Sequence, residues 1–171
     1  MRNMKQKLFL FGVIRVFAIA ILACTLLVSC VSLKAPIVNK YQSLDDYKYF
    51  YITPTSELTS SSAAIYGGYG AAQTNSLNPT DVISGIMLKN GFVRLSELNP
   101  DLLEQTLIVN YGESGKRSVS LGLGYTLEVT IQMLSAKTNS IVCLCVAEGI
   151  GSTETDDIRT AINRALTALF K

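Results

Sequence analysis

The sequence predicts an α+β domain in which two helices pack on one face of an antiparallel or mixed sheet of four to five strands. Three observations support this fold class. Apolar residues between 158 and 169 recur at the three- and four-residue spacing of an amphipathic helix. Residues 126–134 alternate between apolar and polar, as a half-buried strand does. The expected elements come in the order strand, helix, three or four strands, helix, which is typical of helices layered on one sheet.

The first 29 residues have the features of a secretory signal peptide. Arg2, Lys5 and Lys7 make a basic start, and a largely apolar run follows from 8 to 28. The alternative is a retained transmembrane anchor, but the uninterrupted apolar part after Arg15 is shorter than the ~20 residues that cross a bilayer. We therefore expect residues 1–29 to be removed from the mature protein.

Residues 27–30 read Leu, Val, Ser and Cys, which resembles the lipobox of bacterial lipoproteins. Cys30 is therefore the expected site of acylation with chains such as palmitate. Cys24 is a second candidate, weaker because bulky Leu22 stands where a smaller residue is usual. Each buried acyl CH₂ contributes ~0.8 kcal/mol, so several chains hold a domain on a bilayer without a spanning helix.

The composition of residues 30–171 excludes several classes of function. The leader contains four of the fifteen basic residues, so the mature chain has eleven basic and thirteen acidic residues, which argues against nucleic-acid binding. The chain has no His, the commonest general base and metal ligand. No nucleophile and base stand out together, so we expect neither an enzyme nor a metal or other cofactor.

Cys143 and Cys145 are the other thiols of the mature chain, and their two-residue spacing in a strand points them the same way. A zinc site would need further ligands. Buried reduced thiols are the favoured interpretation, while a strained pair or an intermolecular bridge stays open.

The start of the mature chain is expected to be a lipidated tether over residues 30–44, followed by the folded domain over 45–171. Residues 46–53 are dense in aromatic and β-branched side chains and predict a strand. Its alternation places Tyr47, Tyr49 and Tyr51 on one face. Such a row can bind sugars, although cross-strand packing explains it as well.

Residues 55–77 predict a long, flexible loop, because they are rich in Ser, Thr, Ala and Gly and contain a single charge, Glu57. Tyr66 and Tyr69 would make this loop a binding lid, and a simple mobile insertion is the alternative. The first helix is expected over 81–90, with Asn78 as its cap and Gly91 after its end.

The second half of the domain predicts strands at 106–111, 126–134 and 141–148, and a last helix at 154–170. The last two strands form a hairpin around a turn at 137–140. Strand 141–148 is apolar on both faces, so it is either central or presents Val142, Leu144 and Val146 to an external partner.

Three stretches resemble a family of small lipoproteins of Bacteroides-type bacteria, an α+β domain of unknown function. They are 47–49, 81–92 with its ending Lys-Asn-Gly-Phe, and 147–161 with its Asp-Asp-Ile-Arg. The resemblance covers nearly all of the mature chain and implies an envelope location and an α+β fold. It implies no activity and no site residues.

Two function hypotheses follow. The first is a non-catalytic adaptor, lipid-anchored through Cys30, that binds an envelope protein through its open sheet face or the 55–77 loop. The second is a glycan- or lipid-binding module that uses the five tyrosines Tyr47, Tyr49, Tyr51, Tyr66 and Tyr69. Val31 follows Cys30, so the Asp that retains some lipoproteins at the inner membrane is absent. We therefore expect the outer membrane, facing the periplasm.

Overall fold

The computed structural model describes residues 32–66, 69–119 and 124–171, and the side chains of 61–75 are outside this description. The folded unit spans Leu33–Lys171. The expected signal peptide, Cys24 and Cys30 lie outside the described residues. Within the described part, no helix is long and apolar enough to cross a membrane.

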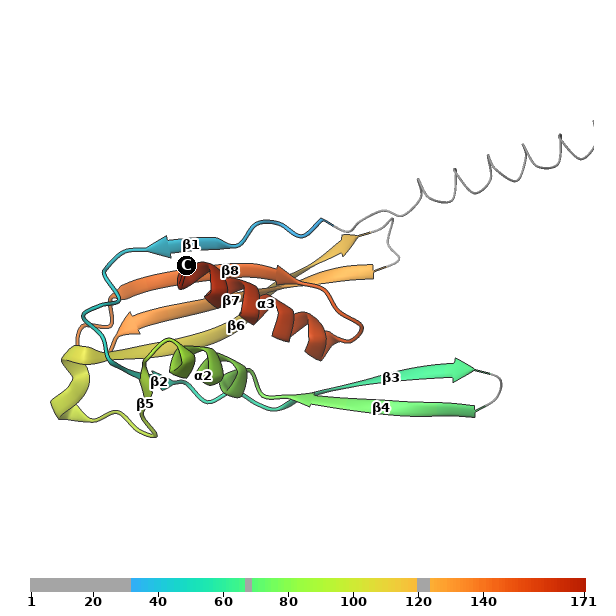
Figure 1. Cartoon of the computed structure of the whole chain (residues 1–171), viewed down its shortest axis with the longest axis horizontal. Helices are drawn as coiled ribbons and strands as arrows, with labels where there is room; N and C mark the ends of the chain where they lie inside the picture. Colours follow the sequence, from blue (N-terminus) through green and yellow to red (C-terminus); the bar gives the residue numbers. More distant parts are fainter. Residues whose placement is uncertain (1–31, 67–68, 120–123) are drawn as a thin grey trace, which may run out of the picture. The chain divides into compact units, whose positions relative to one another are not determined.

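A mixed sheet of six strands forms the centre of the unit, with strand order β1-β8-β7-β6-β2-β5 (Figure 1). Strands β1, β8, β7 and β6 are antiparallel neighbours, and β2 runs parallel to both β6 and β5. The strands are β1 Ile37–Lys40, β2 Tyr49–Ile52, β5 Val93–Arg94, β6 Thr106–Val119, β7 Gly124–Ser135 and β8 Ile141–Gly149. The α+β class is confirmed, and the expected strand count was too low.

Strand β1 lies inside the stretch expected to be a tether. Ile37–Lys40 pairs antiparallel with β8, from Ile37 opposite Val146 to Lys40 opposite Cys143. Only Val38 packs against the core from this strand, so it carries no apolar alternation that a sequence pattern could detect. The expected tether thus ends before β1, because the vacant edge of β8 offers its backbone groups as partners.

Helices α2 (Pro79–Lys89) and α3 (Glu154–Leu169) both lie on one face of the sheet (Figure 1). Asn78 caps α2 by accepting from the Thr80 N–H, and Thr153 caps α3 by accepting from the Asp156 N–H. Gly91, directly after α2, has a φ of 88° and lets the chain turn away. Both helices occur where the sequence predicts them.

The hydrophobic core lies between the two helices and the inward face of the sheet. Its largest fully buried side chains are Phe50, Ile83, Met87, Leu107, Leu127, Ile131, Met133, Ile158, Ile162, Leu166, Leu169 and Val109. The apolar side of the alternation in 126–134 is therefore the helix-covered side, as expected.

A second, two-stranded sheet replaces the loop expected over 55–77. Strands β3 (Leu58–Tyr66) and β4 (Tyr69–Leu77) pair antiparallel along their whole length (Figure 1). Near the base of this hairpin, the Ser60 and Thr155 hydroxyls are 2.8 Å apart. Small polar residues give no apolar period, so the strands were not predictable from local pattern. A short 3₁₀ helix, η1 (Pro100–Gln105), precedes β6.

Strand β6 also continues beyond its expected end at residue 111. Its pairing with β7 extends to Val119 opposite Gly124, with a register shift between Glu113 and Gly115. The polar and glycine residues of 112–118 suggest a loop when read alone, but all of them except Ser114, at the register shift, have a partner residue on β7.

Candidate functional site

The fold leaves the sheet face opposite the helices without a covering layer in the part of the chain that the structure describes. Neither α-helix packs on it. The register places Asn110 opposite Gln132 and Ile108 opposite Leu134, and on the other side of β7, Leu144 opposite Gln132. We call this surface the open face. Its half-buried side chains are Tyr49, Tyr51, Ile108, Asn110, Thr130, Gln132, Leu134, Leu144 and Val146.

The three apolar residues expected to face a partner, Val142, Leu144 and Val146, differ in how deeply they are buried. Leu144 and Val146 are half-buried on the open face, as the alternation predicts. Val142 is fully buried, so its assignment to an exposed surface was wrong. The pairing of β7 with β8 shifts register between Met133 and Leu134, and the Tyr41 and Gln42 N–H groups both donate to the Val142 carbonyl. At this irregularity the Val142 side chain joins the hydrophobic core.

The five candidate tyrosines do not form one row. Tyr49 and Tyr51 share the open face of β2, opposite to buried Phe50 and Ile52. Tyr47 precedes β2, and its hydroxyl donates to Gln42 Oε1 at 3.1 Å while its ring packs against the core. Tyr66 and Tyr69 face each other in the register of the β3–β4 hairpin, and their side chains lie outside the described residues.

The thiols of Cys143 and Cys145 are buried and not joined by a disulfide, with 3.5 Å between the two Sγ atoms. The hydrogen bond that it shares with Cys143 and burial raise the pKa of Cys145 well above the ordinary thiol range. Among the described residues, no group of three or more His, Cys, Asp or Glu side chains could hold a metal ion. The pair thus packs as small apolar side chains in the core.

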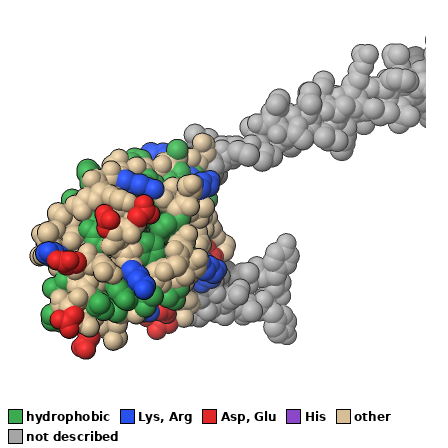
Figure 2. Space-filling view, turned by 60° about the vertical axis from the view of Figure 1, so that its left-hand side comes forward, with side chains coloured by type: hydrophobic (Ala, Val, Ile, Leu, Met, Phe, Trp, Pro, Cys, Tyr) green, Lys and Arg blue, Asp and Glu red, His purple; other side chains and the backbone are tan. Residues whose placement is uncertain are grey.

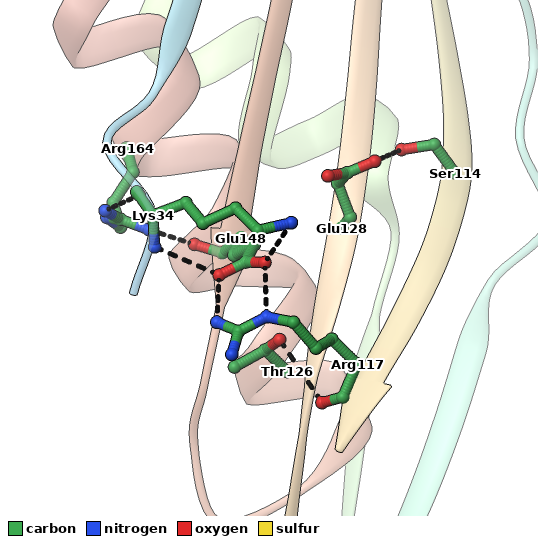
Figure 3. A network of polar contacts seen from close by, with 7 residues as sticks. All are labelled: Lys34, Ser114, Arg117, Thr126, Glu128, Glu148 and Arg164. Atoms are coloured by element: carbon green, nitrogen blue, oxygen red, sulfur yellow. Dashed lines mark hydrogen bonds and ion pairs between the residues drawn. The ribbon is translucent and has the colours of Figure 1, made fainter. Parts of the chain in front are cut away.

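A buried carboxylate, Glu148, organises a polar network at the end of β8 that the sequence did not predict (Figure 3). Glu148 is 2% exposed. Arg117 of β6 donates to it through two nitrogens on one edge of its guanidinium, from Nε to Oε1 at 2.9 Å and from Nη2 to Oε2 at 2.7 Å. Two donors of this geometry match the two carboxylate oxygens, which is the strongest form of ion pair.

Lys34 supplies the rest of the Glu148 environment. Its backbone N–H donates to Oε2 at 3.0 Å, and its Nζ lies 3.1 Å from Oε1. The Arg117 hydrogen bonds, followed by those from Lys34, lower the pKa of Glu148 to about 2 against the opposing effect of burial. Glu148 is therefore ionised at neutral pH, and the cationic side chains of Arg117 and Lys34 neutralise its charge.

Arg164 of α3 completes this network from the helix side (Figure 3). Its guanidinium donates to the Glu148 carbonyl through Nη1 and to the Lys34 carbonyl through Nη2, the latter at 2.7 Å. Lys34 is thus held from two sides, by the Glu148 side chain and by Arg164. We call this set, Lys34, Arg117, Glu148 and Arg164, the Glu148 clamp, and it binds the segment that enters the domain to the edge of β8.

The clamp has no local sequence signature, because its four members come from segments up to 130 residues apart in the chain. The one hint is the charge itself. A glutamate that directly follows an apolar strand such as 141–147 must either be solvated or find partners.

Comparisons with known proteins give a distant likeness of fold. No family model and no curated protein matches the chain. A point variant of dodecameric PelC from Paraburkholderia phytofirmans has 12% sequence identity and a TM-score of 0.45, over 78% of this chain and 96% of that one. A second dodecameric PelC structure from the same organism has 12% identity and a TM-score of 0.43, over 77% of this chain and 96% of that one.

Proposed function

We propose that this chain is a lipid-anchored protein of the bacterial envelope whose folded domain is a non-catalytic adaptor. Its acyl chains on Cys30 would hold it at the periplasmic side of the outer membrane, and its open face would dock another envelope protein. The observation that carries the adaptor role is the open face itself. The helices cover one face of the sheet and bury it in the core, whereas the other face has no covering layer among the described residues.

The chemistry of the open face suits a protein partner. Apolar side chains such as Ile108 and Leu144 alternate with the amides of Asn110 and Gln132. Protein interfaces combine apolar area with hydrogen-bonding groups in this way, and tyrosine is enriched among them. The lack of His in the sequence supports a role without proton transfer.

The Glu148 clamp supports the anchored arrangement. Lys34 is fixed to the domain and follows Cys30 by four residues. An extended chain spans at most ~3.6 Å per residue, so acylation at Cys30 would hold the clamped end of the domain within about 14 Å of the acylated residue. A short link of this kind presents the domain to its partner in a restricted set of orientations.

Site-specific photo-crosslinking in intact cells tests the adaptor role. A photoreactive amino acid in place of Gln132, at the centre of the open face, is expected to give one reproducible adduct of higher mass. The matched control is the same substitution at Asn163, an exposed residue of α3. Equal adduct patterns at the two positions, or none at Gln132, would refute docking on the open face.

A glycan- or lipid-binding module is the second candidate, because Tyr49 and Tyr51 lie together and half-buried on the same face. Tyrosine rings supply apolar area with a polar tip for such ligands. Thermal shift with panels of glycans and phospholipids is the test. A rise in Tm that disappears in Tyr51→Ala would favour this candidate over the adaptor.

A further inference from the structure

A hollow of about 550 Å³ lies at the end of the domain where both helices finish. Figure 2 shows this end of the molecule, where hydrophobic side chains are bordered by basic and acidic ones. The hollow is open to solvent. It is lined by Lys40, Leu44, Asp45, Tyr47, Lys48, Asn90, Gly91, Phe92, Leu169, Phe170 and Lys171.

The floor of the hollow is apolar and built from separate segments of the chain. The rings of Phe92 and Phe170 lie 5.9 Å apart and tilted, which joins the end of α3 to the segment after α2. Leu44 and Tyr47, both half-buried, come from the connection between β1 and β2. A cavity of this size accommodates one or two large side chains of a partner.

The rim of the hollow carries an excess of positive charge. Lys40, Lys48 and Lys171 are all exposed, and none has an ion pair with a carboxylate in the part of the chain that the structure describes. Asp45 is the single acidic lining residue, and its carboxylate accepts a hydrogen bond from Ser43. Elsewhere on the domain, basic side chains such as Lys116 and Lys137 do pair with glutamates.

We propose that this hollow binds an acidic segment of a partner protein, with a large apolar side chain seated on the Phe92–Phe170 floor and flanking carboxylates at the lysines. Charge complementarity selects this occupant, because the ammonium groups of Lys40, Lys48 and Lys171 outnumber the two carboxylates of the lining, those of Asp45 and of the Lys171 main chain, around an apolar floor. The hollow is a second contact surface, distinct from the open face, and does not depend on the docking proposed for that face.

Its position favours a protein over the anchoring membrane. Strand β1 and the residues before it run from Lys34 at the Glu148 clamp to Lys40 at the hollow. Six residues at ~3.3 Å each place these two ends about 20 Å apart. This step alone rests on the proposed acylation of Cys30, which would attach the bilayer to the other end of this segment and not beside the hollow.

Fluorescence anisotropy with the full chain in detergent tests the proposal. The probe is a labelled hexapeptide with leucine and tryptophan at its centre and two aspartates on each side. Two further peptides carry lysine in place of the four aspartates, or alanine in place of the two apolar residues. We expect saturable binding of the first peptide only, weakened by added salt because the lysines are exposed.

Single charge reversals then locate the site. Lys48→Glu is expected to weaken binding of the acidic peptide at least tenfold, and Lys48→Arg to retain it within about twofold. Lys89→Glu is the matched control, since Lys89 is an exposed lysine at the end of α2 that does not line the hollow. The affinity of Lys89→Glu for the acidic peptide should stay within about twofold of that of the natural chain. The lysine-flanked peptide should gain affinity for Lys48→Glu.

Three results would overturn the proposal. One is the absence of saturable binding by the acidic peptide. Another is equal weakening by Lys48→Glu and Lys89→Glu, which would indicate unspecific attraction. The third is binding to vesicles of anionic phospholipid that Lys48→Glu abolishes while the peptide does not compete, which would make the hollow a lipid site. None of these readouts depends on crosslinking at Gln132, so the proposal that the open face docks a partner can be refuted or supported independently of the hollow.

Discussion

Glu148 shows how a single buried charge can be a stabilising element. Its carboxylate loses nearly all contact with water but gains two hydrogen bonds from one edge of the Arg117 guanidinium and the contacts of two groups of Lys34. Burying a charge without partners is very costly, and removing one member of a buried pair leaves the other poorly solvated. The stabilisation therefore depends on the whole clamp.

Glu148→Gln is expected to lower the free energy of unfolding by about 2 kcal/mol, because the amide keeps the shape but loses the charge-assisted hydrogen bonds. Chemical denaturation at pH 7 measures this. Glu104→Gln is the control, since Glu104 pairs with Lys137 on the exposed surface and should show no measurable change. Equal effects of the two substitutions would refute the role of burial.

The same carboxylate predicts a pH dependence of stability. Its folded pKa of about 2 lies below the ordinary value of 4.5, so at intermediate pH the unfolded chain binds more protons than the folded one. Stability from this group is fully present above about pH 5 and is lost as the pH falls towards 2. Chemical denaturation at pH 6 and at pH 3 measures this. Between these two pH values, the free energy of unfolding should fall less in Glu148→Gln than in the natural chain. Identical losses would contradict the assignment.

At Gly149 the backbone of helix α3 lies against the backbone of β8. A Cβ at this position would lie 1.8 Å from the Asp157 carbonyl oxygen and 2.6 Å from the Ala161 nitrogen, both backbone atoms of α3. Gly149→Ala should therefore displace the helix and cost about 3 kcal/mol in the free energy of unfolding. Gly112→Ala is the control, because nothing lies within 4 Å of its Cβ position. A Tm of Gly149→Ala equal to that of the control would show that the helix shifts freely.

At the scale of elements, the β3–β4 hairpin is expected to be less stable than the central sheet. Each of its strands pairs only with the other within the described residues, whereas β7 pairs on both sides. Isolated two-stranded ribbons are marginally stable in water, because they bury little apolar surface. The hairpin therefore draws its stability from its base, where Ser60 meets Thr155 and Leu77 enters the core.

Hydrogen exchange should separate these elements. Backbone amides of β3 are expected to exchange much faster than those of β7 at the same pH, because local opening of the hairpin exposes little core. Mass spectrometry of the exchanged, digested protein measures both at once. Protection of β3 equal to that of β7 would show that the hairpin is paired with something further in solution.

At the scale of the whole molecule, anchoring and folding should be separable. The folded unit begins at Leu33, so Cys30→Ala is expected to release the protein from the membrane fraction while leaving Tm unchanged. Membrane fractionation after metabolic labelling with an alkyne fatty acid checks the first part, and Cys24→Ala is the control. A Cys30→Ala protein that remains labelled would move the acylation site to Cys24.

The sequence by itself determined the α+β class, both α-helices, the cap of α2 at Asn78 and the hairpin of β7 and β8. These features depend on neighbours in the chain: the helical spacing between 158 and 169, the alternation of 126–134 and the cap at Asn78. Local periodicity and capping are written into consecutive residues, which is why a pattern can find them.

Only the tertiary structure decided which strands complete the sheet and which charged groups are buried. Strand β1 forms because the edge of β8 is vacant, and the far half of β6 because β7 runs beside it. Val142 is buried in the core where the pairing of β7 with β8 shifts register, and Glu148 is buried beside Lys34 and Arg117. Each depends on partners distant in sequence, and backbone pairing and ion pairing leave no periodic trace in either segment alone.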